Sequence, residues 1–399
     1  MKHFLLAVCV AGQLTMTANA MPTDAELEQS LQGNPEWRVN QAEAELSGIE
    51  ADLQQSSPHE WQTGGTLQQR QLSTGGSTGE WTWRLERGWR LPGKGRLDRD
   101  IAASMREQAG YRRLDGVRTL KEEALGLWFD WAEAKARRAL LVRQLQEYSQ
   151  LLDKTSRLVR SGELSQRDQV QLQAEMARLQ VQERESDRQE QMAEETLAHH
   201  YPGLMRIKDA GLPTPEAALP GEERMQQILL AQPAVKAVRS QVRTDTLRTD
   251  RASAERLPDP VLGVFTARDG LPVERVVGVS VSVPLGGERR RILTREAQAR
   301  LAQTEARQAA EMKMQEHELD QLLAEVRFGL GVWEQSQQGL QQARQSAAMA
   351  GRAWELGEGD LQEASLARRL SLEAEDAELR ARLRLLRAQS ILGLRGGQA

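Results

Sequence analysis

The sequence predicts a mainly helical protein with a small β part, in which one order of elements occurs twice: helix, β-hairpin, long helix and second helix. The first observation is that all 13 prolines lie outside two long windows, 93–201 and 285–399. Since proline in a helix interior costs about 3 kcal/mol, both windows are predicted to hold long helices. The second is a stretch of alternating side chains before each window. The third is the duplication itself, marked by Asn34-Pro35 and Gln232-Pro233 at matching places.

The composition favours thin helical layers over a thick core. Of the 399 residues, 39% are hydrophobic, 4% aromatic and 28% charged. Strong helix formers such as Ala, Leu, Glu, Gln and Arg are frequent, so the chain is expected to bury narrow stripes. The formal net charge of -4 is too small to indicate a nucleic-acid partner, and none is expected.

The first segment, 1–20, has the features of a secretory signal peptide. A basic start at Lys2 precedes the apolar run Phe4–Val10, and Ala18-Asn19-Ala20 fits a small-residue cleavage site. The only cysteine, Cys9, lies inside this segment and fits a lipoprotein signal badly. The exported chain is therefore expected to have no disulfide and no lipid anchor. No apolar run of about 18 residues follows, so no membrane-spanning helix is expected.

Apolar residues recur every three or four positions through both windows, as on the buried face of an amphipathic helix. From Gly95 to Arg160 such a helix would be about 100 Å long. Two of the stripes are Leu319, Leu322, Val326, Leu330 and Trp333, and Leu366, Leu370, Leu379, Leu383 and Leu386.

Gly162 and Gly357 lie where the stripes pause, and each is predicted to form the tip of a helical hairpin. A proline-rich linker is predicted between the two copies. The predicted ranges are 21–201 for the first repeat with its tip at about 161–166, 202–220 for the linker, and 221–399 for the second repeat with its tip at about 356–361.

Four short segments alternate between apolar and polar side chains, which is typical of strands. They span about 60–73, 79–92, 260–268 and 274–285 and are expected to pair as two hairpins. Two hairpins are too small for an independent sheet. Strands of about ten residues can cross a membrane when tilted, with one face toward lipid and the other toward a lumen. Four strands cannot close a barrel, so several chains would have to combine.

Four of the nine tryptophans lie in or beside the first hairpin: Trp61, Trp81, Trp83 and Trp89. Tryptophan gathers at the membrane–water interfaces of spanning proteins. These residues are therefore candidate membrane-interface aromatics, and the alternative is a packed sheet face.

No residue pattern indicates an enzyme, a cofactor site or a metal site. The histidines are scattered, and the pair His199-His200 is expected to be a surface helix end. The motifs HExxH, GxSxG and the P-loop are absent. Gly93-Lys94-Gly95 is expected to be a strand-to-helix turn.

Acidic residues gather near the predicted tips. On one chain they would be solvated helix ends, but repeated around a symmetric ring they would form a constriction that attracts cations. The candidates are Asp153, Asp168, Asp360 and Glu363, together with Glu163 and Glu358 at the tips themselves.

Several of these segments together resemble one family. They are the duplicated helix starts, the strand start Leu257-Pro258-Asp259-Pro260, the turns Leu91-Pro92-Gly93-Lys94-Gly95-Arg96 and Val283-Pro284-Leu285-Gly286-Gly287-Glu288-Arg289, and the tips Ser161-Gly162-Glu163-Leu164 and Leu356-Gly357-Glu358-Gly359. Their order resembles the outer membrane efflux (TolC-like) proteins, the exit ducts of tripartite pumps in Gram-negative bacteria. The short chain and the Pro-Gly-Lys turn look most like the heavy-metal cation efflux branch.

The resemblance implies a homotrimer in the bacterial outer membrane that extends into the periplasm. Its twelve strands would form one β-barrel in outer-membrane lipid, and its helices would form a long periplasmic α-helical barrel. A periplasmic adaptor (membrane fusion) protein would contact the hairpin tips, and an inner-membrane pump would load the duct. By position, the adaptor contact would be Gly162, Glu163, Leu164, Gly357, Glu358 and Gly359. Glu163 and Glu358 make these tips more acidic than the apolar family pattern.

Two other functions fit the same helices. The first is a periplasmic coiled-coil adaptor or scaffold protein, and the second is an outer-membrane duct for drugs or secreted protein. The two hairpins with lipid-type alternation favour a duct over a scaffold. No metal-ligand cluster is visible in the sequence, so the cargo is assigned to heavy-metal cations by the resemblance alone.

Overall fold

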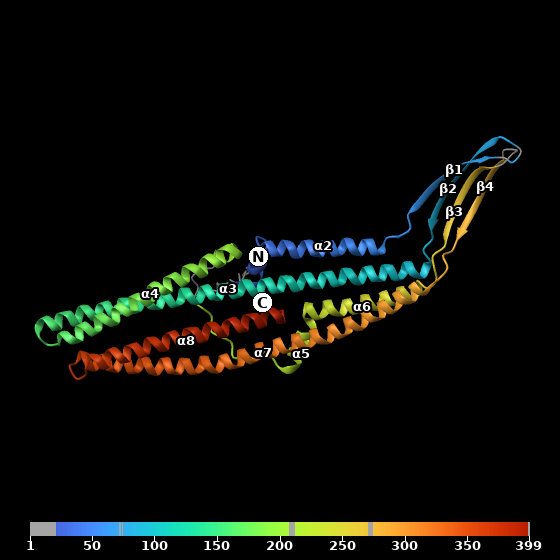
Figure 1. The fold of residues 1–399 in the computed structure, drawn as a ribbon. Helices are drawn as coiled ribbons and strands as arrows, with labels where there is room; N and C mark the ends of the chain where they lie inside the picture. Colours follow the sequence, from blue (N-terminus) through green and yellow to red (C-terminus); the bar gives the residue numbers. More distant parts are fainter. Residues whose placement is uncertain (1–20, 72, 74, 207–211, 270–273, 398–399) are drawn as a thin grey trace, which may run out of the picture. The chain divides into compact units, whose positions relative to one another are not determined.

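The computed structural model is mainly helical with one small antiparallel sheet, as the sequence predicts (Figure 1). It describes residues 21–71, 73, 75–206, 212–269 and 274–397, so the expected signal peptide lies outside the described residues. The chain divides into two compact units. Unit 1 takes the described residues of Met1–Asn34, Leu120–Leu219 and Leu322–Ala399, and unit 2 those of Pro35–Thr119 and Pro220–Gln321.

Prolines begin three helices of unit 2. α2 (Pro35–Gln55) and α6 (Pro233–Ala254) start at the duplicated prolines, and α3 (Pro92–Ser161) starts at the proline after the first hairpin. A proline suits this position because its φ is already helical and its missing N–H would have no partner there. The other helices of the unit are α5 (Glu222–Ala231) and the beginning of α7 (Glu288–Glu355).

Unit 2 also holds a four-stranded antiparallel sheet with its strands in chain order. They are β1 (Trp61–Gln71), β2 (Ser77–Gly88), β3 (Val261–Asp269) and β4 (Glu274–Ser282). Both predicted hairpins form, and pairing of β2 with β3 joins them into one sheet. β2, predicted to reach residue 92, ends at Gly88. Pro92 begins α3, and the segment predicted as a turn, Gly93-Lys94-Gly95, forms the first turn of this helix.

Unit 1 consists of helices that run beside one another in hairpins (Figure 1). α4 (Gln166–His200) turns back along the last part of α3, and α8 (Leu361–Gly396) turns back along the last part of α7. Two short elements complete the unit: α1 (Asp24–Leu31) and the 3-10 helix η1 (Pro202–Arg206), which lies in the predicted linker.

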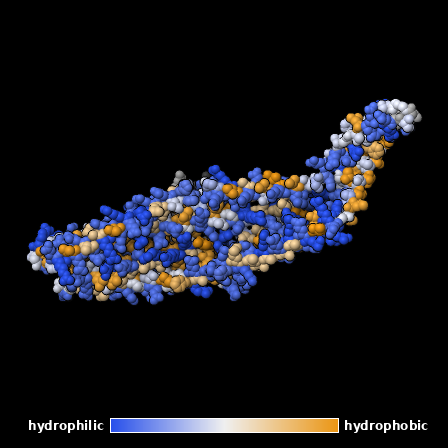
Figure 2. Space-filling view, viewed as in Figure 1, coloured by the Kyte–Doolittle hydropathy of each residue, from blue (hydrophilic) through white to orange (hydrophobic). Residues whose placement is uncertain are grey.

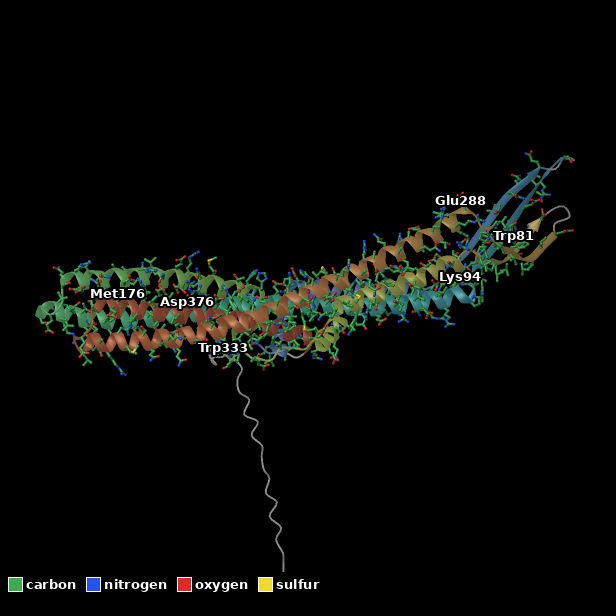
Figure 3. All side chains as sticks on the ribbon, turned by 90° about the horizontal axis from the view of Figure 1, so that it is seen from below. Trp81, Lys94, Met176, Glu288, Trp333 and Asp376 are labelled. Carbon is green, nitrogen blue, oxygen red and sulfur yellow. The ribbon has the colours of Figure 1, made fainter. Side chains whose placement is uncertain are left out.

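The stripe predicted on α7 is buried in unit 1: Leu322, Val326, Leu330 and Trp333 are each at most 9% exposed. The indole of Trp333, which lies on α7 (Figure 3), also donates to Glu378 Oε1 on α8 at 3.0 Å. Apolar contact and one polar bond therefore hold the α7–α8 hairpin together.

The stripe predicted on α8 is only half correct. Leu383 and Leu386 are buried, but Leu366 and Leu370 near the tip stay exposed. There the buried positions are Ala367 and Ser371, one residue further along the helix. Small side chains let helices approach closely, so the contact face shifts onto them and the leucines lie beside it.

Within the described residues, no helix contains a stretch long and apolar enough to span a membrane.

Replacing Leu386, which is 3% exposed, by alanine should lower the free energy of unfolding of unit 1 by about 2–5 kcal/mol, because a buried cavity replaces the side chain. The matched control is Leu366→Ala on the same helix, where exposure leaves little contact to lose, and a loss below about 1 kcal/mol is expected. Chemical unfolding of the purified protein, followed by far-UV circular dichroism, measures both. Equal losses for the two variants would contradict the packing described here.

Candidate functional site

The register of the sheet sorts its side chains onto two faces. Trp83 lies opposite Gly65 on β1 and Thr266 on β3, and Thr266 lies opposite Val277 on β4. Alternate residues of a strand point to opposite faces. Every second residue of β2 counted from Trp83, together with its cross-strand partners, therefore lies on the same face as Trp83. This is called the apolar face, and the other is called the polar face.

Large hydrophobic side chains occupy the apolar face. The most exposed are Leu67 at 82% and Val279 at 79%, and Figure 2 shows hydrophobic residues along the β4 side of the sheet. The set is Trp61, Leu67, Trp81, Trp83, Leu85, Leu262, Val264, Val277, Val279 and Val281. A continuous exposed apolar surface of this kind marks a contact with lipid or with another protein.

The polar face carries a hydrogen-bonded ion network. Glu80 is buried, with Oε1 at 2.8 Å from Arg70 Nε, and its Oε2 accepts from Gln68 Nε2 at 2.6 Å. Arg70 Nη2 also reaches Asp269 Oδ1 at 3.2 Å, which links β1 to β3 across β2. The remaining polar-face residues include Gln62, Thr66, Thr82, Arg84, Glu86, Ser280 and Ser282. Such a surface suits contact with water or dissolved solutes.

Three of the four candidate interface tryptophans share the apolar face. Trp61 and Trp81 lie near its two ends, about 20 Å apart along the strand direction. Trp61 has the guanidinium of Arg87 5.4 Å above its ring. Trp89 follows β2, where its N–H donates to the carbonyl of Pro260 at 2.7 Å. The membrane-interface role of the four remains a prediction.

A buried ion network lies in unit 2 where the sheet meets the helices. Lys94, in the first turn of α3, is 2% exposed (Figure 3). Its Nζ lies 2.9 Å from Asp259 Oδ1 and 3.2 Å from Glu255 Oε2. The second oxygen of Asp259 lies 3.0 Å from His59 Nε2, and the N–H of Leu91 donates to Oδ1 at 3.2 Å. Asp259 therefore fixes the chain just before β3 against the start of α3.

The network continues along the helices through Asp98. Its Oδ2 lies 3.1 Å from Arg90 Nη1, and its Oδ1 accepts from Arg251 Nε on α6 at 2.8 Å. Arg251 also pairs with Glu255, and Arg290 of α7 reaches Glu255 Oε1 at 3.2 Å. The segments that flank the strands are thus bound to α3, α6 and α7 by paired charges.

Both carboxylates next to Lys94 have a lowered pKa. Burial alone would raise the pKa of Asp259, but hydrogen bonds from His59, Lys94 and the Leu91 N–H outweigh it. For Glu255, burial is likewise outweighed by hydrogen bonds from Arg251 and Lys94, and its pKa falls. Both groups stay ionised in neutral solution and keep the buried lysine paired.

The tip residues lie in two similar helix–turn–helix reversals of unit 1. Gly162 and Gly357 have φ of 82° and 76°, which favours glycine at the end of a helix. The N–H groups of Glu163 and Glu358 donate to Leu158 and Ala353, closing each preceding helix. The side chains of Glu163 and Glu358 are exposed, Leu164 and Gly359 are half-buried, and Gly162 and Gly357 are exposed.

Two of the four acidic candidates take part in helix N-termini. Asp168 accepts from the Ser165 hydroxyl at 2.8 Å at the start of α4, and Asp360 accepts from the N–H of Gln362 at 3.3 Å at the start of α8. Asp153 and Glu363 are exposed. Asp360 is the N-cap of α8, and Asp168 holds Ser165, the N-cap of α4, so both have roles within one chain. A constriction that involves all four remains a prediction.

Sequence reasoning missed the network around Lys94. Lys94 and Asp259 lie beside glycine and proline at two turns, where charged residues are ordinarily solvated. A faint signal was their matching places, after the first hairpin and before the second. No group of three or more His, Cys, Asp or Glu in the described part of the chain is arranged to hold a metal ion. His199 and His200 are the last residues of α4.

No protein-family model and no curated protein matches the chain. Solved structures do. The outer membrane protein VceC from Vibrio cholerae is 16% identical, with a TM-score of 0.73 over 94% of this chain and 95% of its own. The CmeC outer membrane channel of Campylobacter jejuni is 12% identical, with a TM-score of 0.68 over 94% and 85%. The open MtrE outer membrane channel of Neisseria gonorrhoeae is 17% identical, with a TM-score of 0.66 over 96% and 92%. This chain shares the fold of these channels over nearly its whole length.

Asp259→Asn should destabilise unit 2 by about 3 kcal/mol at neutral pH, because it leaves the buried Lys94 with a single carboxylate partner. The lowered pKa gives the sign of the pH effect. Ionised Asp259 stabilises the fold above the unfolded-state pKa of about 4, and this contribution is lost as the pH falls through the lower folded-state pKa.

The difference between wild type and Asp259→Asn in unfolding midpoints should therefore shrink below about pH 4. Asp100→Asn on α3, whose side chain is 48% exposed and faces Arg96 at 3.9 Å, is the matched control and should change little. A constant difference from pH 7 to pH 3 would contradict the role of the Asp259 carboxylate.

Proposed function

We propose that this chain is the outer-membrane exit duct of a tripartite efflux system. The observation that carries the proposal is the sheet, with an exposed apolar face across all four strands and an ion network on its other face. Lipid against the first face and an aqueous lumen against the second would satisfy both. The shared fold with outer membrane channels supports the same interpretation.

In this proposal three chains combine. β1 and β4 are edge strands, each with a row of backbone groups that has no partner strand among the residues the structure describes. In lipid such groups have to be paired, and pairing β4 of one chain with β1 of the next would close a twelve-stranded barrel. α3, α4, α7 and α8 of the three chains would form the long α-helical barrel in the periplasm.

We also propose that the chain is an internal duplication, with repeats 21–201 and 221–399 joined by the linker 202–220, and an export signal at 1–20. Each repeat would supply two strands and one helical hairpin. Three duplicated chains would then give a wall with nearly sixfold symmetry.

The hairpin tips are the proposed contact for a periplasmic adaptor, with an inner-membrane pump behind it. The exposed carboxylates of Glu163 and Glu358 lie on the two reversals, where a partner can reach them. We propose heavy-metal cations as the cargo, since acidic groups repeated around a ring attract cations. Drugs or secreted proteins are the alternative cargoes.

A periplasmic coiled-coil adaptor or scaffold is the second candidate function, favoured by the length of α3 and α7. In a scaffold the apolar face of the sheet would need a protein to cover it. A duct explains that face and the edge strands together.

Val279→Arg should prevent insertion of the sheet into the outer membrane, because a charge on the lipid face costs about 2–4 kcal/mol at mid-membrane depth. Ser280→Arg, the neighbour on the polar face, is the matched control and should insert normally. Outer-membrane fractionation and heat-modifiable migration of the trimer measure both. A soluble wild-type monomer, or equal insertion of the two variants, would contradict the duct.

Glu163→Arg combined with Glu358→Arg should abolish efflux and leave the trimer intact, because the charges change only where the adaptor would bind. Glu185→Arg, at an exposed position of α4 away from the tip, is the control. Growth of a deletion strain that carries each variant, on divalent metal salts and separately on drugs, also identifies the cargo. Loss of the trimer in the tip variant would show that the tips hold the assembly.

A further inference from the structure

We propose that Arg268 and Arg275 bind the phosphate of a phosphorylated lipid headgroup at the loop end of the apolar face. This inference rests on the proposed function, because it requires the apolar face to lie in a lipid layer. It concerns a site for membrane lipid and is separate from the conduction path.

The last two rungs of the β3–β4 ladder sort their charges by face. Arg268 lies opposite Arg275, and Asp269 lies opposite Glu274. Arg268 is two residues from Thr266, the partner of Trp83, and therefore lies on the same face. The two arginines thus lie on the apolar face and the two acids on the polar face. Like charges therefore lie directly opposite each other on both faces, two arginines on the apolar face and two acids on the polar face.

On the polar face Asp269 has a partner, Arg70, at 3.2 Å. On the apolar face neither arginine side chain makes a hydrogen bond or ion pair with any other residue that the structure describes, and both are exposed. Like charges directly opposite on adjacent strands repel each other and destabilise the pair. A bound anion between the two guanidinium groups would remove this repulsion.

The surroundings of the pair suit a lipid phosphate. Arg268 also lies opposite Trp81, which in turn lies opposite Leu67, so the arginines border the hydrophobic set. Gly79, next on the same face of β2, has no side chain, and a Cβ there would meet no atom within 4 Å. In membrane proteins indole rings lie at the level of the lipid headgroups, and guanidinium groups bind phosphate through bidentate hydrogen bonds. Acyl chains below the phosphate would then contact Leu67 and Val277.

The helix end of the same face differs. Arg87 has its guanidinium over the Trp61 ring at 5.4 Å and donates from Nε to the carbonyl of His59 at 3.1 Å. It is held by protein groups, whereas Arg268 and Arg275 are available. The asymmetry assigns the phosphate to the leaflet at the loop end of the sheet.

The test measures binding of lipid A, and of the same lipid with its phosphates removed, to the purified trimer in neutral detergent by native mass spectrometry. Wild type should prefer the phosphorylated lipid. Arg268→Gln and Arg275→Gln should each weaken its binding about fivefold, the effect of one arginine at a membrane surface. Arg84→Gln, at an exposed position of the polar face, is the matched control and should bind as wild type does.

The double variant Arg268→Lys/Arg275→Lys keeps both charges and should keep most of the preference for phosphorylated lipid A. It tests the site if the glutamine variants fail to assemble. Equal binding of the two lipids, an equal loss in Arg84→Gln, or displacement of the lipid by millimolar inorganic phosphate would overturn the site. Reconstitution into vesicles separates the two proposals. Insertion without lipid preference contradicts this site alone, whereas failure to insert contradicts the duct and the site with it.

Discussion

Lys94 is 2% exposed, and a buried ammonium group needs carboxylates beside it. The segments that supply these carboxylates define the junction between the sheet and the helices of unit 2. Asp259 comes from the segment that leads into β3, and Glu255 comes from the end of α6. A buried charge pair has strict geometry, so it fixes the direction in which each chain segment leaves the helices. The segments it fixes lead into the strands, whose register decides the two faces of the sheet, because a slip by one residue would exchange them.

The sorted faces of the sheet are the consequence that matters for function. Exposed valines and tryptophans lie on one face and the Glu80 network lies on the other, so the two faces suit different surroundings. In the proposed duct a boundary between lipid and water meets both faces, and the edge strands are the reason that the proposal needs several chains. The proposed site at Arg268 and Arg275 lies at the loop end of the apolar face, where a lipid phosphate would neutralise the two positive charges.

The tips of unit 1 have a different character. Their backbone is held by glycines with positive φ and by side-chain caps, so the structure there is complete within one chain. Glu163 and Glu358 contribute only exposed charge to it. Substitutions at these glutamates can therefore report on partner binding without disturbing the fold, which separates their role from that of Asp259, where any change alters the junction.

The sequence alone determined the elements, because proline placement, alternation and glycine breaks are local signals. Pro35, Pro92 and Pro233 begin helices, and the four strands lie within a few residues of their predicted places. The stripe of α7 was also predictable, since its spacing follows from helical geometry. Only the tertiary structure decided that β2 pairs with β3, that small residues replace Leu366 and Leu370 in the α8 contact, and that Lys94, Asp98, Asp259 and Arg251 meet. The β2–β3 pairing and the ion network join segments that lie more than a hundred residues apart, and the sequence holds no local signal for a contact of that kind.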